Sequence, residues 1–512
     1  VMIGRQKKEN KLFNRVRGMK TASMPAMHIG GVMPPPDWNT ENYSTINENG
    51  YKDVRINPLS TFSIDVDNAS YSNVRRYLTQ GNMPPVDAVR IEEMINYFKY
   101  DYPEPDGEHP FSVTTELSDC PWNSEHQLLH IGLQGKSIDK KDLPSSNLVF
   151  LLDVSGSMNS YNKLPLVKKA FRLLVDQLRP NDRVAIVVYA GAAGKVLDST
   201  PGNNKKKILE AIENLNAGGS TAGGEGIKLA YKIAKENFIE GGNNRIILAT
   251  DGDFNIGISS TSEMERLVEK ERENGVFMTV LGFGMGNIKD DKMETIADKG
   301  NGNYAYIDNI HEARKVLISE FGGTLFTIAK DVKFQLEFNP LKVKSYRLVG
   351  YENRLLNDED FNDDTKDAGE MGAGHTVTAL YEIILAGSDE IAISIDPLKY
   401  QSRENVAGKT SKEILTIKLR YKEPDGNKSK LLEKIVKENS INPEIISKNF
   451  NFSAAVASFG MLIRGSEFMG NTSFENILKL AENAKGSDNE GYRSEFIQLV
   501  KTTRSLNFFA EE

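Results

Sequence analysis

The sequence predicts an α/β domain with a doubly wound, mostly parallel sheet, inserted into a β-sandwich that has helices before and after it. Three observations lead to this prediction. Short apolar runs alternate with helical periods between residues 146 and 326. Strand-like segments lie both before and after this region. The strands before it are too few to form a stable sheet alone, so their partners must come later in the chain.

The apolar runs of the central region are short and uninterrupted, and amphipathic segments fill the gaps between them. We expect strands at 148–152, 184–189, 246–249 and 277–283, and helices at 164–178, 226–238, 261–274, 293–299 and 310–326. Short apolar strands that alternate with amphipathic helices are typical of a parallel sheet covered on both faces.

The flanks of this region supply the strands of the expected sandwich. Candidate strands are 111–117 and 127–133 before it, and 332–338, 345–349, 376–385 and 414–421 after it. Short helices are expected at 68–79 and after Pro84-Pro85, and helical periodicity returns from Ser453 onward. The predicted parts are a disordered linker 1–55, an N-terminal region 56–145 that contributes strands to the sandwich, the α/β domain 146–326, and a C-terminal region 327–512 with sandwich strands and helices.

Composition and motifs restrict the classes of function. The net charge of −8 argues against a general nucleic-acid binder, because phosphate groups need a basic face. The single cysteine, Cys120, excludes an internal disulfide and a thiolate metal cage. The sequence has no phosphate loop with Gly-Lys-Ser/Thr, no Gly-x-Ser-x-Gly elbow and no His-Glu-x-x-His segment. We therefore expect a protein that is not an enzyme.

Oxygen-bearing side chains are expected to meet at the carboxyl edge of the parallel sheet. One apolar strand leads into Asp153, Ser155 and Ser157, and a second leads into Asp251. Open α/β sheets bind ligands at this edge. Carboxylate and hydroxyl oxygens suit Mg²⁺, Mn²⁺ or Ca²⁺ and do not suit zinc. Since the site has few protein charges, the cation keeps positive charge that a carboxylate of another molecule can meet.

A glycine-rich segment, 218–224, adds hydroxyl groups before a helix. Together the three segments resemble the metal-ion-dependent adhesion site of von Willebrand factor type A domains, in which Asp-x-Ser-x-Ser is followed by a Thr and an Asp. The resemblance covers about 147–322. It implies five metal-site residues, namely Asp153, Ser155, Ser157, Thr221 and Asp251. Ser220 competes with Thr221 as the hydroxyl donor, and Asp253 is an extra carboxylate beyond the pattern.

The flanks resemble bacterial YfbK-type proteins. The segments that carry this resemblance are 63–76, 87–98 and 350–354 with the acidic loop that follows, and it extends over nearly everything after residue 55. Members of that family are commonly lipoproteins of the cell envelope. The resemblance therefore implies an envelope location, facing the periplasm or the surface, with the signal and lipidated cysteine missing from this chain.

The predicted function is a non-enzymatic binding module that uses a divalent cation, Mg²⁺ or else Mn²⁺ or Ca²⁺, to capture an acidic group of a protein partner at the cell envelope. One alternative is a cytoplasmic adaptor or co-chaperone of a MoxR-type ATPase. A metal-dependent hydrolase is a third reading. Nucleic acid is not expected as a partner, and a membrane is expected only through the missing lipid anchor.

Two further acidic segments have a plain interpretation and a functional one. Asp65, Asp67 and Ser70 could begin a calcium loop, but the glycine and the terminal glutamate of such a loop are absent, so helix capping is favoured. The loop 358–370 carries seven acids and could bind Ca²⁺ or a basic partner. A solvated, mobile loop is the favoured interpretation there.

Overall fold

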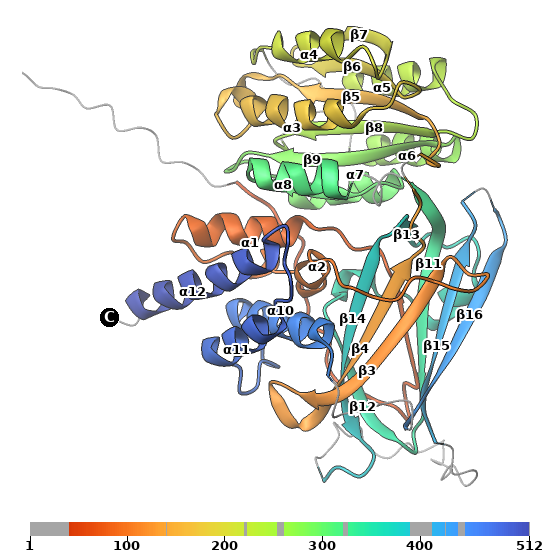
Figure 1. The fold of residues 1–512 in the computed structure, drawn as a ribbon, viewed down its shortest axis with the longest axis vertical. Helices are drawn as coiled ribbons and strands as arrows, with labels where there is room; N and C mark the ends of the chain where they lie inside the picture. Colours follow the sequence, from red (N-terminus) through yellow and green to blue (C-terminus); the bar gives the residue numbers. More distant parts are fainter. Residues whose placement is uncertain are drawn as a thin grey trace, which may run out of the picture. The chain divides into compact units, whose positions relative to one another are not determined.

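The computed structural model describes residues 40–139, 141–219, 223–252, 261–320, 326–389, 412–424, 426–438 and 446–510, and Figure 1 shows their fold. Among these residues no helix has the length and apolar character needed to cross a membrane.

The α/β domain is built on a sheet of six strands in the order β10-β9-β8-β5-β6-β7. All neighbours are parallel except β7, which is antiparallel to β6. The strands are β5 Ser146–Asp153, β6 Arg183–Tyr189, β7 Ala193–Pro201, β8 Asn243–Thr250, β9 Val276–Phe283 and β10 Tyr304–Ile307. The predicted mostly parallel sheet is confirmed, and β7 and β10 are strands that the sequence analysis did not expect.

Helices cover both faces of this sheet, as Figure 1 shows. They are α3 Leu164–Gln177, α4 Lys205–Glu213, α5 Gly223–Glu236, α6 Thr261–Glu273, α7 Asp290–Lys299 and α8 Ile310–Arg314. Alternate residues of β5 belong to different hydrophobic cores: Phe150 packs with the core that includes α3, and Val149 and Leu151 pack with the core that includes α5. A strand that packs against helices on both faces presents apolar side chains to both, which explains the uninterrupted apolar runs in the sequence.

The last helix of the domain is shorter than the sequence predicts. A helix was expected over 310–326, but α8 ends at Arg314 and continues as one π-helical turn, η3 Lys315–Ser319. The side chain of Asn309 caps α8 by accepting hydrogen bonds from the backbone N–H groups of His311 and Glu312. The rest of the expected helix, 321–325, lies outside the described residues.

Strands from both flanks of the α/β domain pair with one another, so the predicted insertion into a β-sandwich is confirmed. One sheet has the order β1-β12-β14-β4-β3, and in the other β11 pairs with β2, β13 and β15, while β15 pairs with β16. The strands are β1 Lys52–Asp53, β2 Leu59–Ser63, β3 Phe111–Cys120, β4 Asn123–Gly135, β11 Thr327–Phe338, β12 Val343–Val349, β13 Gly369–Gly372, β14 Thr376–Leu385, β15 Glu413–Lys422 and β16 Ser429–Lys437. The pair β4 and β14 joins residues before the domain to residues after it.

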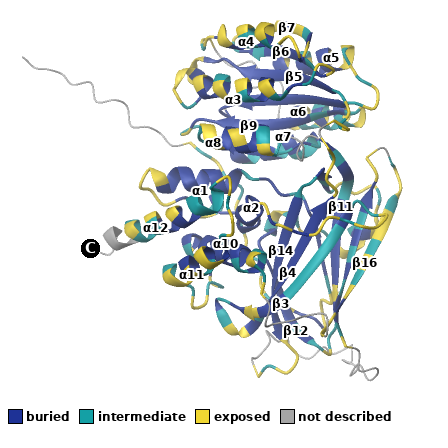
Figure 2. Ribbon diagram, in the orientation of Figure 1, coloured by how far each residue is buried: buried dark blue, intermediate teal, exposed yellow. Residues whose placement is uncertain are grey.

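Aromatic side chains fill the space between the two sheets of the sandwich. Phe62 stacks on Phe334 with ring centroids 5.3 Å apart, and Phe338 stacks on Tyr346 at 4.1 Å. The Tyr381 hydroxyl hydrogen-bonds the Ser60 hydroxyl of the facing sheet at 2.9 Å. Figure 2 shows these strands as buried, in contrast to the partly exposed edge strand β16.

Helices from the beginning and the end of the chain share one further hydrophobic core. They are α1 Ala69–Thr79, α2 Ile91–Asn96, α10 Lys448–Arg464, α11 Phe474–Ala484 and α12 Tyr492–Ala510, with short 3₁₀ turns η1 Val86–Ala88, η2 Gly156–Asn159, η4 Glu352–Arg354 and η5 Asp358–Asn362 elsewhere in the chain. The Phe98 ring contacts Phe452 and Phe496, which brings α2, α10 and α12 together.

The prediction of a linker over residues 1–55 is wrong for residues 40–55. The carboxylate of Glu41 accepts hydrogen bonds from Arg76 and Tyr77, and Val54 is buried beside β12. These polar and apolar contacts fix the segment, although its sequence has no regular period. Residues 1–39 lie outside the described residues.

Basic side chains of the same chain contact the acidic loop 358–370, but Asp358, Glu359, Asp363 and Asp367 are exposed, so the solvated loop is confirmed and its mobility stays a prediction. Lys333 donates a hydrogen bond to the backbone oxygen of Asp363 at 2.6 Å, and Arg272 forms an ion pair with Asp367 at 2.6 Å. Phe361, a residue of this loop, is buried. The sequence shows the acids close together, but the bases that neutralise them come from other strands and helices.

Candidate metal centre

Asp153 is the last residue of β5 and lies at the carboxyl edge of the parallel sheet, fully buried. Its Oδ1 accepts a hydrogen bond from the backbone N–H of Ser155 at 2.9 Å, and its Oδ2 accepts one from the Thr250 hydroxyl at 3.3 Å. Burial raises the pKa of Asp153 to about 6, and the nearby charge of Asp251 acts in the same direction, against the hydrogen bonds from Ser155. The carboxylate is thus oriented by two neighbours at the end of adjacent strands.

The chain after Asp153 makes a tight 3₁₀ turn, η2, which brings two hydroxyl groups together. Ser155 Oγ and Ser157 Oγ are 3.1 Å apart, and Ser157 is exposed. The turn is tied to the glycine-rich segment, because the Gly156 N–H donates to the Gly219 oxygen at 3.0 Å. A Cβ at Gly156 would lie 3.4 Å from that oxygen, in ordinary van der Waals contact.

Asp251 follows the end of β8 and completes the described part of the centre. Its carboxylate is buried and accepts a hydrogen bond from the Ser157 side chain. Lys163 Nζ is 2.9 Å from Asp251 Oδ2 and 3.1 Å from Asn287 Oδ1. Burial by itself would raise the pKa of Asp251, but the charge of Lys163 and these hydrogen bonds together hold that pKa below its ordinary value.

The structure brings together four of the five predicted metal-site residues. Asp153, Ser155, Ser157 and Asp251 meet at one edge of the sheet through the hydrogen bonds given above. Thr221 lies outside the described residues, and so do its competitor Ser220 and the extra carboxylate Asp253.

The donor set fits a hard divalent cation. Two carboxylates and two hydroxyl groups are the oxygen ligands that Mg²⁺, Mn²⁺ and Ca²⁺ prefer. Ser157 is an exposed residue while Asp153 and Asp251 are buried, so the charged oxygens lie inside and the centre reaches the surface of the described residues at Ser157.

Sequence reasoning missed three residues of this centre: Thr250, Lys163 and Asn287. Thr250 directly precedes Asp251, and its position at the end of a buried strand was a usable signal. Lys163 stands just before α3, where a buried lysine has no sequence signature. Asn287 comes from a loop more distant in the chain, and only the folded structure places it next to Lys163.

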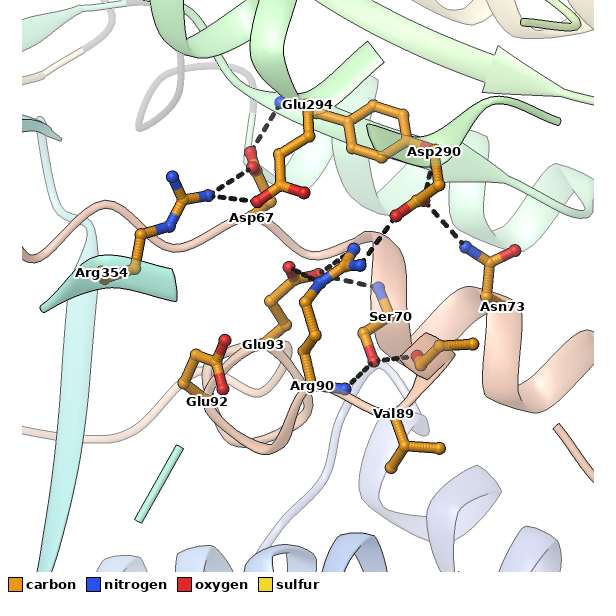
Figure 3. Close-up of polar contacts among 12 residues, drawn as sticks. Asp67, Ser70, Asn73, Val89, Arg90, Glu92, Glu93, Asp290, Glu294 and Arg354 are labelled. Atoms are coloured by element: carbon orange, nitrogen blue, oxygen red, sulfur yellow. Dashed lines mark hydrogen bonds and ion pairs between the residues drawn. The ribbon is translucent and has the colours of Figure 1, made fainter. Parts of the chain in front are cut away.

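A second acidic cluster, which we call the junction cluster, lies where α1 and α2 meet the α/β domain (Figure 3). Oxygens of Asp67, Glu93 and Glu294 lie within 4.8 Å of one another, and all three residues are buried. Arg354 Nη2 is 3.2 Å from Asp67 Oδ2 and 2.8 Å from Glu294 Oε1. Arg90 forms ion pairs with Glu93 and, at 2.7 Å, with Asp290.

The junction cluster corrects the interpretation of Asp67 and Ser70 as helix-capping residues. Asn68 is the N-cap of α1 and makes no side-chain cap bond. Asp67 instead accepts a hydrogen bond from the backbone N–H of Tyr304 in β10 at 2.8 Å, and the Ser70 hydroxyl donates to the Ala88 oxygen at 2.7 Å. These side chains join parts of the fold that the sequence alone does not bring together.

Three families match the sequence. Residues 147–317 match the von Willebrand factor type A domain, residues 323–506 match the C-terminal family described as "Uncharacterized protein YfbK, C-terminal", and residues 37–130 match the family described as "von Willebrand factor". The protein "Uncharacterized protein YfbK" of Escherichia coli (strain K12) is 46% identical over 490 residues, which cover 94% of this chain and 83% of that protein. The protein sll0103 of Synechocystis is 32% identical over 188 residues, or 36% of this chain and 43% of that protein.

Solved structures with similar folds include a von Willebrand factor type A protein from Catenulispora acidiphila, with a TM-score of 0.41 and 15% identity over 74% of this chain and 88% of that one. Another is the ArnB paralog VWA2 from Sulfolobus acidocaldarius, with a TM-score of 0.36 and 14% identity over 78% of this chain and 98% of that one.

Proposed function

This chain belongs to the YfbK family and carries a von Willebrand factor type A domain, and we propose that it is a non-enzymatic binding module that captures a carboxylate of a protein partner through a divalent cation. Domains of this type generally bind protein partners. The observation that carries the proposal is the meeting of Asp153, Ser155, Ser157 and Asp251 at one edge of the parallel sheet.

Each side chain of the centre has a part in this proposal. Asp153 supplies a buried anionic oxygen, and the Thr250 hydroxyl holds its orientation. Ser155 and Ser157 supply neutral hydroxyl oxygens, and Asp251 orients Ser157 by accepting its hydrogen bond. A bound cation would supply positive charge that a carboxylate of the partner can meet. Mg²⁺ suits this role because it needs few protein carboxylates and keeps positions for water or a ligand.

A location at the cell envelope is part of the same proposal. Its support is the resemblance to YfbK-type proteins, whose members are commonly envelope lipoproteins. Fractionation of the cells that make the native protein, with sequencing of its mature N-terminus, tests it. A mature terminus that starts at a lipidated cysteine supports the location, and a protein recovered wholly from the cytosol contradicts it.

The binding function is tested by capture of partners from an envelope extract on the immobilised full chain, in Mg²⁺ and in EDTA. We expect capture of specific partners in Mg²⁺ and its loss in EDTA, because the partner's carboxylate needs the cation. Asp153→Ala should also abolish capture. The matched control is Asp176→Ala, which removes an exposed carboxylate from α3 of the same domain.

Equal capture in Mg²⁺ and in EDTA would contradict the proposal, and so would full capture by the Asp153→Ala variant. Circular dichroism of both variants shows whether the fold is intact. Loss of capture counts in favour of the proposal only when the spectrum of Asp153→Ala matches that of the unchanged protein.

A further inference from the structure

Lys163 is a buried cation that contacts the candidate metal centre directly. Its side chain is 9% exposed, and its ammonium group forms an ion pair with Asp251 at 2.9 Å. Lysine is rarely buried unless it is paired, since moving its charge out of water costs several kcal/mol or more. The burial of Lys163 is therefore explained by the groups around it.

The surroundings of Lys163 hold the ammonium group at the centre. Gly284 has a φ of +86°, and a Cβ at that residue would lie 2.3 Å from Lys163 Cε, so the lysine stem occupies the space that the missing side chain leaves. Asn287 Oδ1 accepts a hydrogen bond from Nζ at 3.1 Å. Any residue other than glycine at position 284 would displace the lysine stem.

The loop that carries Gly284 and Asn287 is itself fixed by the segment that begins at Thr40. The backbone N–H of Thr40 donates to the Gly286 oxygen at 2.8 Å, and the backbone N–H of Gly286 donates to the Glu41 carboxylate at 2.7 Å. Glu41 in turn forms an ion pair with Arg76 of α1 at 2.7 Å. The acceptor of the Lys163 ammonium is thus held by contacts that extend to α1.

Lys163 changes the charge that the centre presents to a cation. Asp153 and Asp251 together carry two negative charges when both are ionised, and the ammonium group neutralises one of them. Counting the charged groups of the described residues, a divalent cation at this centre would then leave a net positive charge of one, where the same centre without the lysine would be neutral. Like charges in a partly buried site repel strongly, because the effective dielectric constant is lower than in water.

We propose that Lys163 lowers the affinity of the metal centre for a cation alone. Cation binding then depends on an anionic ligand at the same centre. This inference rests on the proposed function and deepens it. The ligand class is a carboxylate, whose negative charge offsets the positive charge that remains. Cation and ligand then bind cooperatively, each raising the affinity for the other by the same factor.

The test is a titration of the full chain with Mn²⁺, followed by calorimetry, in the absence and presence of acetate as the carboxylate probe. For Lys163→Met we expect Mn²⁺ to bind about tenfold more tightly without acetate, since about 1.4 kcal/mol of repulsion corresponds to that factor. We also expect the increase in Mn²⁺ affinity caused by acetate to shrink.

Two control variants make the outcome specific. Lys168→Met removes a lysine of α3 whose Nζ donates to the backbone oxygen of Glu213, away from the centre, and should change neither affinity. Asp153→Ala should abolish Mn²⁺ binding. A Lys163→Met variant that binds Mn²⁺ as weakly as the unchanged protein, or more weakly, would overturn the inference.

The same titrations separate the failure of this inference from the failure of the proposed function. If the unchanged protein binds Mn²⁺, Asp153→Ala does not, and Lys163→Met matches the unchanged protein, then the inference alone is overturned. If neither the unchanged protein nor Lys163→Met binds Mn²⁺, with or without acetate, then the proposed function is overturned and the inference with it.

Discussion

The candidate metal centre and the junction cluster are both groups of buried carboxylates, but they differ in the cations that neutralise them. At the metal centre one ammonium group, that of Lys163, contacts one carboxylate, that of Asp251. At the junction cluster the guanidinium group of Arg90 contacts two carboxylates, Glu93 and Asp290, and that of Arg354 contacts four, Asp65, Asp67, Glu294 and Asp298.

This difference distinguishes a cluster that holds parts of the fold together from a cluster that can bind a ligand. Arginine presents several donors in a fixed plane, so one side chain can satisfy carboxylates from two elements at once and hold them together. Lysine presents a point charge, and Ser157, which shares the Asp251 carboxylate with Lys163, is an exposed residue. The geometry and number of the neutralising cations, more than the number of acids, therefore decide which cluster can accept a ligand.

The largest expected effect is the loss of stability when the junction cluster loses a guanidinium. Arg90→Met should lower the free energy of unfolding by about 3–5 kcal/mol, because Glu93 and Asp290 would remain buried without their counter-charge. Urea denaturation followed by fluorescence measures the change. Arg266→Met, at an exposed position of α6, is the control and should change little. If Arg90→Met lowers the free energy of unfolding no more than the control does, the junction cluster does not hold these parts of the fold together.

A smaller effect of opposite sign is expected at the metal centre. Asp153→Asn should raise the free energy of unfolding of the cation-free protein by roughly 1–2 kcal/mol, since it removes a buried negative charge close to Asp251 and keeps an oxygen for the Ser155 N–H. Urea denaturation in EDTA measures it. If Asp153→Asn destabilises the protein as Arg90→Met does, the two clusters do not differ in the way we describe.

The third expected effect is a gradual change in stability that is spread over more than two pH units. Burial is the first cause that raises the pKa of Glu93 to about 7, and the charge of Glu294 adds to it, against the effect of Arg90. The folded protein therefore binds more protons than the unfolded chain between pH 4.5 and 7, so this contribution to stability is present below pH 4.5 and is lost as the pH rises through 7.

Glu93→Gln removes this dependence. Relative to the variant, the unchanged protein should lose at most about 1.4 kcal/mol of unfolding free energy for each pH unit between 4.5 and 7. Urea denaturation of both proteins at a series of pH values measures the difference. Glu240→Gln, an exposed glutamate, should show the same pH dependence as the unchanged protein. Parallel curves for Glu93→Gln and the unchanged protein would contradict the assignment.

The sequence predicts well those features that one stretch of chain determines. The strands β5 and β8 contain the apolar runs Leu148–Leu152 and Ile246–Ala249 because they are buried on both faces, and Asp153 and Asp251 follow from where these strands end. The strand β7 escaped prediction because it lies at the sheet edge, where polar residues such as Lys195 are exposed. The short strand β10 was too brief to give a clear pattern.

Features that depend on contacts between distant segments could not be predicted in the same way. The junction cluster needs Asp67, Glu294 and Arg354 from three separate regions, and none of them is unusual in its own surroundings. The contact between Lys163 and Asn287 also forms only when two loops meet. In each case the sequence shows a charge, but the folded chain decides which partner neutralises it.

The insertion of the α/β domain has a consequence for the order in which the chain folds during its synthesis. The strand β4 leaves the ribosome early, but its partner β14 is made only after the whole inserted domain. The α/β domain has all of its paired strands within one continuous segment. It can therefore fold before β14 is available to pair with β4. Closing the sandwich is then a late step between distant residues, and such contacts form slowly.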